Sequence, residues 1–364
     1  TYDSGRYEEN MDRAMQVADW NGFPGRRREA ARRGKLLGRG LANYVESSIG
    51  APREQARVKV RPDGIVDVVI GTQPSGQGHE TSFAQVISDL LHMPDESVRI
   101  ILGDTDVVRV GGGSHSGRSM RHAATVFCKA ATELIAKGRA IAAIAMGSMP
   151  EDVWFDDGRF ASRDTNRTFD FFELAQEAAR LPLPEKLKDG LAVVADNEMH
   201  DPVFPNGSVV CEVEVDPDTG EAALTRYASV DDVGRCINPL IVHGQTHGAI
   251  AQGVGQAMWE QIFLDSASGQ PLTGSLMDYA MPRADTLPPF ITEIVEVLSP
   301  TNPLGIKAAG EGGTTAAPAV VFSAILDAVR ELGVGEVPMP ATPYAVWRAI
   351  TDAKITSASP TGHP

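Results

Sequence analysis

The chain has 364 residues and a formal net charge of −15, since 48 acidic residues outnumber 33 lysines and arginines. An acidic surface of this kind disfavours nucleic acid or an anionic membrane as the main partner. Hydrophobic residues make up 42% of the sequence and charged residues 22%, as in ordinary soluble proteins, and the length is sufficient for two subdomains.

The three cysteines, Cys128, Cys211 and Cys236, are far apart and none belongs to a C-x-x-C motif. This spacing disfavours a disulfide framework, a zinc site and an iron–sulfur cluster held by this chain. We find no apolar run of about 18 residues, the length of a membrane span, and no signal-peptide pattern. We therefore expect a soluble, cytoplasmic protein.

In the first half of the chain, surface helices are predicted over the first 40 residues. The signal is the helical spacing of the apolar residues Met11, Ala14, Met15 and Val17. We expect a strand at 40–46 and then a hairpin, whose alternating strands at 56–60 and 65–70 flank a Pro-Asp-Gly turn. There follow a glycine-rich loop at 71–81, a helix at 82–93, a strand at 97–102, a second glycine-rich loop at 111–117 and a long helix to residue 145.

In the second half, a hairpin at 152–160 and a helix at 171–179 precede a long hairpin with strands at 208–215 and 221–230. The remaining predicted elements are a helix at 242–259, strands at 261–264 and 290–298, a buried helix at 316–332 with Pro318 in its first turn, and a helix at 343–350 capped by Thr342. Long helices after antiparallel hairpins favour an α+β fold, with mixed and antiparallel sheets and packed helices, over a doubly wound parallel sheet.

The predicted organisation has four parts. A helical, basic lead-in at 1–45 precedes a first α+β subdomain at 46–205, which carries glycine-rich loops. A second α+β subdomain at 206–356 carries Glu311, and a tail at 357–364 is expected to be disordered.

Several common motifs are absent. Gly76-Gln-Gly78 lacks the third glycine of a Rossmann fingerprint, because Thr81 occupies that position. There is no Walker A sequence, and His115 stands where the serine of a nucleophile elbow would be, which disfavours a hydrolase. His243 and His247 share one helix face, where they either bind a metal or form a packed, hydrogen-bonded pair, the more frequent arrangement.

Four polar glycine-rich segments remain, at 76–81, 111–119, 252–256 and 310–315. Each segment offers backbone N–H groups together with Gln, Ser, Thr or Arg side chains, and two of the four segments lie at helix starts. These groups favour one large phosphate-bearing cofactor. In the last segment, Glu311 lies between Gly310 and two further glycines. It is either a base presented to a bound ligand or an acidic residue favoured by the helix dipole.

The order of six motifs resembles a known family. They are Gly76 to Thr81 (GQGHET), Gly103 to Asp106 (GDTD), Asn238-Pro239, Gly248 to Gly255 (GAIAQGVG), Gly274 to Tyr279 (GSLMDY) and Lys307 to Gly312 (KAAGEG). The chain resembles the molybdenum-binding large subunit of the xanthine dehydrogenase/aldehyde oxidase family, and it is most similar to bacterial carbon-monoxide-dehydrogenase-like large subunits. The resemblance covers nearly the whole chain.

The resemblance implies an oxidoreductase that hydroxylates an aldehyde or N-heterocycle, or oxidises CO, with oxygen derived from water. Glu311 resembles the family's general base, and Gln252 resembles the glutamine beside an apical metal ligand. The cofactor implied is molybdopterin with molybdenum, in the cytosine dinucleotide form usual in bacteria, and no metal ligand comes from protein side chains. Expected cofactor-binding residues are Gly76, Gln77, Gly78, His79, Thr81, Ser114, Ser116, Arg118, Ser119 and Gly310.

The chain differs from the family in one large respect. It starts at Thr1, near the middle of such a subunit, so we expect it to be the C-terminal half alone. The implied partners are the N-terminal half and the subunits that carry [2Fe-2S] clusters and FAD, with a small-molecule substrate. The alternative is a non-catalytic homologue or isolated half-subunit that serves as a binding or assembly scaffold; the presence of Glu311 and Gln252 favours the enzyme.

Overall fold

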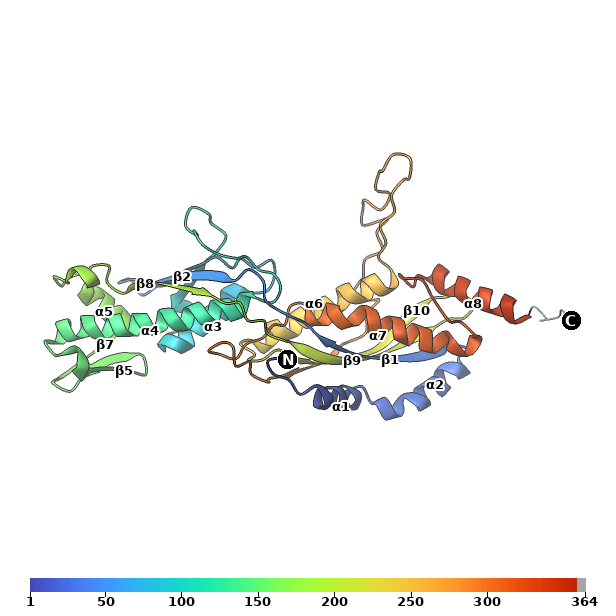
Figure 1. The fold of residues 1–364 in the computed structure, drawn as a ribbon, viewed down its shortest axis with the longest axis horizontal. Helices are drawn as coiled ribbons and strands as arrows, with labels where there is room; N and C mark the ends of the chain where they lie inside the picture. Colours follow the sequence, from blue (N-terminus) through green and yellow to red (C-terminus); the bar gives the residue numbers. More distant parts are fainter. Residues whose placement is uncertain (359–364) are drawn as a thin grey trace. The chain divides into compact units, whose positions relative to one another are not determined.

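The structure is a computed structural model that describes residues 1–358, and it divides into two compact units (Figure 1). Unit 1 consists of Thr1–Ser47, Phe204–Val297 and the chain from Ala309 onward, and unit 2 consists of Ser48–Val203 and Leu298–Ala308. Both units combine helices with mixed sheets, which confirms the predicted α+β class. Of the tail expected at 357–364, residues 359–364 lie outside the described residues.

Unit 1 is built on a four-stranded sheet with the strand order β1-β9-β10-β11. The strands are β1 (Leu36–Val45), β9 (Asn206–Val215), β10 (Ala222–Asp232) and β11 (Ile291–Val295). β9 pairs antiparallel with β1 and β10, so the expected long hairpin is confirmed, while β11 pairs parallel with β10. Because β1 is hydrogen-bonded to β9 along its whole length, residues 36–45 belong to this sheet.

Helices cover both faces of this sheet. On one face, α7 (Gly312–Val329) packs on β1 and β9, and α6 (Pro239–Met258) packs against α7. On the other face lie α1 (Tyr7–Val17) and α2 (Phe23–Arg32). The alternation of β9 explains the two layers, since Val209 packs toward α7 whereas Val210 packs toward α1. The last helix, α8 (Pro343–Ala358), is capped by Thr342, whose Oγ1 accepts a hydrogen bond from the backbone N–H of Ala345 at 3.3 Å.

α7 is the central helix of unit 1. Val320, Val321 and Ile325 are fully buried, and burial of each such side chain contributes about 1.5–3 kcal/mol. Within residues 1–358, the segment Gly312–Leu332 is the one helical stretch long and apolar enough to cross a membrane, so the expectation of no such run is wrong. It is 56% buried over its most apolar window, as is typical of a core helix.

Unit 2 contains a four-stranded sheet with the strand order β4-β3-β2-β8. The strands are β2 (Arg53–Val60), β3 (Val66–Ile70), β4 (Val98–Ile101) and β8 (Ala192–Glu198). β2 pairs antiparallel with β3, as the Pro-Asp-Gly turn predicted, and β3 pairs parallel with β4. The 28-residue α4 (Ser119–Met146) packs on β2 and β8 and against α3 (His79–Leu91).

A smaller sheet completes unit 2, formed by β5 (Val153–Asp156), β6 (Arg159–Ser162) and β7 (Thr165–Asp170). It leads into α5 (Phe171–Ala178), which starts with a capping box between Asp170 and Glu173. The hairpin and the helix expected in this region are therefore confirmed. Rings of Phe155, Phe160 and Phe171 pack together, with centroids 4.9–5.3 Å apart.

Two helices begin earlier than predicted at glycine-rich segments, and one predicted strand is absent. α3 begins at His79 rather than at residue 82, and α7 begins at Gly312 rather than at residue 316, so Pro318 lies inside that helix. In both cases glycines that we interpreted as loop residues begin the helix or directly precede it. The strand expected at 261–264 is absent, and only an isolated bridge joins Leu264 to Pro271.

The segment 261–281, which we call the arm, projects beyond the end of α6 (Figure 1). Its turn is ordered by its own hydrogen bonds, since Asp265 accepts from the backbone N–H groups of Ala267 and Ser268. Seven large apolar side chains on it are 51–92% exposed: Ile262, Phe263, Leu264, Leu272, Leu276, Met277 and Met281. An exposed apolar group of this size is typical of an interaction surface.

Candidate functional site

The two glycine-rich loops of unit 2 touch each other at Gly71 and Gly111. A Cβ atom added to either glycine would overlap the backbone of the other, so this crossing requires glycine at both positions. Gly71 follows β3 and Gly111 lies in the loop that leads into α4. The structure therefore brings together segments 71–81 and 111–119, as expected if they bind one ligand.

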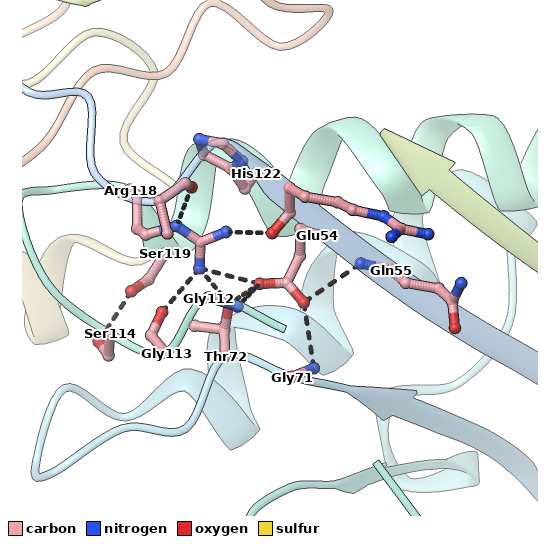
Figure 2. A network of polar contacts seen from close by, with 12 residues as sticks. Glu54, Gln55, Gly71, Thr72, Gly112, Gly113, Ser114, Arg118, Ser119 and His122 are labelled. Carbon is pink, nitrogen blue, oxygen red and sulfur yellow. Dashed lines mark hydrogen bonds and ion pairs between the residues drawn. The ribbon is translucent and has the colours of Figure 1, made fainter. Parts of the chain in front are cut away.

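A buried ion pair beneath these loops connects them (Figure 2). Glu54 of β2 and Arg118 are both fully buried, and Arg118 Nη1 donates to Glu54 Oε2 at 2.9 Å. The same carboxylate accepts hydrogen bonds from the backbone N–H groups of Gly71 at 3.2 Å and Gly112 at 3.4 Å. Thr72 Oγ1 adds a bond of 2.8 Å. One carboxylate thus holds both loops.

The guanidinium of Arg118 is hydrogen-bonded within the protein. Its guanidinium donates to the backbone carbonyl oxygens of Ala51, Arg53 and Gly113 at 2.8, 3.0 and 2.7 Å, in addition to Glu54. Five N–H donors in a planar fork suit this set of acceptors, which a lysine cannot match. Its side chain therefore contacts the loops from beneath.

Four other predicted residues of the loops lie close to one another or to a neighbouring polar side chain: Gln77, Ser114 and Ser116, which are partly buried, and Ser119, which is buried. Gln77 Nε2 donates to Ser114 Oγ at 3.4 Å. Ser114 Oγ in turn lies 2.7 Å from Ser119 Oγ (Figure 2). Ser116 has a left-handed φ of 48°, and its Oγ lies 3.3 Å from His115 Nδ1. An amide and three hydroxyls thus come from two segments about 40 residues apart in sequence, a donor set suited to phosphate and heterocycle edges.

The start of α3 adds three further predicted residues. Gly78 immediately precedes the helix with φ 66°, and Thr81 lies in the exposed first turn. His79 is buried and stacks on Phe83, with ring centroids 4.7 Å apart. Burial lowers the pKa of His79 to about 4, so the imidazole is neutral at pH 7. Its Nδ1 atom has no hydrogen-bond partner within the described chain.

Three further predicted residues, Gly310, Glu311 and Gln252, belong to unit 1. Glu311 is exposed and occupies the N-cap position of α7, but its side chain makes no capping hydrogen bond. The first turn of α7 is instead secured by Thr314, whose Oγ1 donates to the carbonyl oxygen of Ala249 in α6 at 2.9 Å. The carboxylate of Glu311 is thus presented at the surface of unit 1 by a helix start fixed from behind.

Gln252 lies on α6, so the expected loop at 252–256 is wrong: these residues are helical. The glycine at 253 serves packing, since a Cβ atom there would lie 2.6 Å from Ala317 Cβ of α7. Gln252 itself is exposed on the helix. α6 and α7 therefore present Gln252 and Glu311 from two closely packed helices of one unit.

His243 and His247 share one hydrogen-bond partner. Nδ1 of His243 and Nε2 of His247 lie 2.8 and 3.1 Å from the same hydroxyl, Thr292 Oγ1 on β11. In residues 1–358, no group of three or more His, Cys, Asp or Glu side chains is arranged to hold a metal ion. The more frequent of the two interpretations of this histidine pair is thus the one the structure shows.

Sequence reasoning missed Glu54 and Thr72. The signal was present, because β2 buries every second residue and Glu54 is in phase with Ala56, Val58 and Val60. A carboxylate on the buried face of an alternating strand needs a cationic or hydrogen-bonding partner.

Comparison with known proteins identifies the family of this chain. The model of the molybdopterin cofactor-binding domain family matches residues 13–288. The chain is 34% identical over 355 residues to the 6-hydroxypseudooxynicotine dehydrogenase complex subunit gamma of Paenarthrobacter nicotinovorans, covering 95% of this chain and 44% of that protein. It is 31% identical over 371 residues to the carbon monoxide dehydrogenase large chain of Hydrogenophaga pseudoflava, covering 97% and 46%.

The fold agrees as well. The solved structure of reconstituted CO dehydrogenase from Oligotropha carboxidovorans superimposes with a TM-score of 0.87 at 29% identity, over 98% of this chain and 46% of that one. The chain thus spans less than half the length of the curated relatives it matches. These matches confirm the predicted resemblance, and the chain belongs to the family of molybdopterin cofactor-binding domains.

Proposed function

We propose that this chain is the cofactor-binding part of a molybdenum hydroxylase. Such an oxidoreductase hydroxylates an aldehyde or an N-heterocycle, or oxidises CO, with oxygen derived from water. Membership of the molybdopterin cofactor-binding family supports the choice of cofactor. The names of the relatives include both a carbon monoxide dehydrogenase and a 6-hydroxypseudooxynicotine dehydrogenase. The observation that carries the proposal is an exposed carboxylate, Glu311, at the glycine-flanked start of α7.

The residues of unit 2 fit a pterin that carries a dinucleotide. Gln77, Ser114, Ser116 and Ser119 offer amide and hydroxyl groups, and the starts of α3 and α4 offer backbone N–H groups for phosphate. The buried, neutral imidazole of His79, with Nδ1 lacking a partner in the described chain, suits a ligand hydrogen bond. The loops also have room, since a Cβ atom at Gly76 or Gly113 would meet no atom within 4 Å.

Arg118 has a different role in this proposal. Because its donors are directed at Glu54, the hydroxyl of Thr72 and backbone carbonyl oxygens, it positions the two loops and does not bind the cofactor itself. When bound, the cofactor, which we propose to be the cytosine dinucleotide form, supplies a redox-active metal that accepts electrons from the substrate.

Glu311 is proposed to accept the proton that is released when water-derived oxygen is transferred. A carboxylate is suited to this task when it is ionised and free of internal partners, and Glu311 makes no capping hydrogen bond that would have to break first. Gln252 is proposed to donate a hydrogen bond near the reacting atoms from the adjoining helix, and Gly310 leaves the approach to the carboxylate open. Glu311 lies beyond the residues matched by the family model, so this role needs its own test.

The proposed partners supply what this chain does not. The rest of a large subunit would complete the cofactor site, and subunits with [2Fe-2S] clusters and FAD would carry electrons away. The three thiols here are separate and free, and Cys211 is buried in the core. Burial raises the pKa of the Cys211 thiol, so this group is an inert part of the packing.

The proposal is tested by replacing Glu311 with glutamine in the complete complex. Glutamine keeps the size and hydrogen bonding of the side chain but cannot accept the proton. We expect kcat to fall by at least about 10²–10⁴-fold, the contribution of a general base, while the molybdenum content stays unchanged. Turnover of an aldehyde, an N-heterocycle and CO is measured together with metal content.

The matched control is Glu336→Gln, which makes the same charge change at an exposed carboxylate beyond α7 and should leave turnover unchanged. Near-normal turnover of Glu311→Gln at full molybdenum content would exclude the base assignment. Absence of turnover in the unmodified, fully loaded complex with all three substrate classes would instead favour a scaffold.

A further inference from the structure

Three residues form a row across neighbouring strands of unit 1, behind the start of α7. Tyr44 of β1 pairs with Gly207 of β9, and Gly207 pairs in turn with Asp231 of β10. Because the middle position has no side chain, the tyrosine ring crosses over it and its hydroxyl donates to Asp231 Oδ1 at 2.8 Å. A Cβ atom on Gly207 would lie 2.6 Å from both Tyr44 Cε1 and Asp231 Oδ1.

The row ends against α7. A Cβ atom on Gly312, the residue after Glu311, would overlap Tyr44 Oη, so the tyrosine hydroxyl touches the first residue of the helix. Tyr44 is 8% exposed and Asp231 is 4% exposed. The second carboxyl oxygen of Asp231 accepts a hydrogen bond from Ser229 Oγ at 2.7 Å. Asp231 thus holds the hydroxyl of Tyr44 in place, and this hydroxyl lies against Gly312, the residue that follows Glu311.

The protonation of these groups suits a fixed support. Burial, and then the nearby Asp231 carboxyl, raise the pKa of Tyr44 well above its ordinary value, so the hydroxyl keeps its proton and remains a donor. A helix start has no hydrogen bonds of its own to hold its first residues, so a rigid wall against Gly312 limits how far the preceding residue can move.

We propose that Tyr44, held by Asp231, is a positioning residue that sets where α7 begins and therefore where the Glu311 carboxylate lies. This proposal rests on the proposed function of Glu311 for its catalytic consequence, but the contact itself can be tested without catalysis. A displacement of about 1 Å in a catalytic group can cost about 10²-fold in rate, which makes such a support consequential.

The test uses Tyr44→Phe, which removes only the hydroxyl, with Tyr227→Phe as the matched control. Tyr227 lies in the same sheet and is also buried, but its hydroxyl has no hydrogen-bond partner in the described chain. In the full chain, we expect Tyr44→Phe to accelerate hydrogen exchange at 315–317, the first hydrogen-bonded amides of α7, about five- to tenfold, as for loss of one ordinary hydrogen bond. Tyr227→Phe should leave this exchange unchanged.

A double-mutant cycle tests the contact directly. Gly312→Ala should lower the melting temperature in the wild-type background, because the new Cβ atom overlaps the hydroxyl. It should lower it less in the Tyr44→Phe background, where the hydroxyl is gone and the nearest ring atom would lie 3.1 Å away. Additive effects, or equal exchange in the two tyrosine variants, would overturn the positioning role.

In the complete complex, Tyr44→Phe should lower kcat roughly ten- to a hundredfold with unchanged KM and molybdenum content, because the base is displaced but the binding loops are intact. Loss of molybdenum, or a change in KM alone, would contradict the proposal. If Glu311→Gln proves harmless while the exchange and melting results hold, the proposed function fails and the structural contact stands.

Discussion

Each unit of the molecule places one buried carboxyl group beneath a glycine-rich segment, and the two groups are satisfied differently. In unit 2, Glu54 is paired with the guanidinium of Arg118 and accepts backbone hydrogen bonds from both loops. In unit 1, Asp231 accepts hydrogen bonds from the hydroxyls of Tyr44 and Ser229. Removal of one partner of a buried ion pair leaves an uncompensated charge and is strongly destabilising. Removal of one hydroxyl from a hydrogen-bond network costs less free energy.

This contrast matches the tasks proposed for the two units. The loops of unit 2 come from distant parts of the chain and must be held together to form a binding surface. The start of α7 in unit 1 is already fixed by its helix and by Thr314, so its support needs only to limit a small displacement. The three predictions below test the contrast.

The largest effect should follow from Arg118→Met, which leaves Glu54 buried without its cation. We expect the free energy of unfolding of unit 2 to fall by about 3–5 kcal/mol, measured by urea unfolding and by hydrogen exchange at 53–77 and 111–119. The double variant Glu54→Leu with Arg118→Met should recover much of that loss. The control Arg53→Met breaks an exposed ion pair with Asp196 and should cost far less. An equal cost for both arginines would show that the buried pair is not special.

A smaller effect, with a distinct pH dependence, should follow from Asp231→Asn. One hydroxyl loses its acceptor, which costs about 1 kcal/mol. Burial raises the pKa of Asp231 above its ordinary value of 3.8, despite the opposing influence of Ser229, Tyr44 and the nearby His243. Above pH 3.8 the folded state therefore keeps a proton that the unfolded chain has released, so this group lowers stability as the pH rises.

The stability advantage of wild type over Asp231→Asn should accordingly shrink from pH 3.8 upward and become constant above the folded pKa. Unfolding free energies at a series of pH values measure this difference. Asp218→Asn, at an exposed turn position, is the control and should show no such trend. An advantage that grows with pH would mean that the folded-state pKa of Asp231 lies below 3.8, against the raised pKa given above.

The smallest effect concerns Gln77→Ala and Ser116→Ala on the loops of unit 2. Loss of one hydrogen bond of about 0.5–1.5 kcal/mol should weaken cofactor binding roughly two- to tenfold. Molybdenum content should fall while turnover per bound molybdenum stays near normal, in contrast to Glu311→Gln. Gln176→Ala, exposed elsewhere in unit 2, should change neither quantity. Full occupancy with altered substrate preference would place these side chains at the substrate.

Local patterns explain which parts of the fold were predictable. The β2–β3 and β9–β10 hairpins are fixed by turns within a few residues, so the sequence alone was sufficient to find them. The parallel pairs β3–β4 and β10–β11 join strands separated by helices, and nothing local specifies them. At 252–256 the glycines were misinterpreted, because a glycine that lets two helices approach looks the same in sequence as a glycine in a loop.

The same limit applies to the site. Glu311 and the loops at 76–81 and 111–119 could be named from their motifs, and Gln77 and Ser114 do come together. The supports beneath them could not be named, because Tyr44, Gly207 and Asp231 are far apart in sequence and meet only through strand register. Arg118 was named as a cofactor ligand, whereas its surroundings indicate a supporting role.

The arm at 261–281 affects the tendency of this chain to self-associate in solution. The arm exposes seven large apolar side chains. Self-association of the chain through the arm would remove this apolar surface from water. The net charge of −15 opposes such contacts only at long range and is screened within about 10 Å at 0.1 M salt. We therefore expect the arm to promote aggregation of the isolated chain, and to do so more strongly as the salt concentration rises.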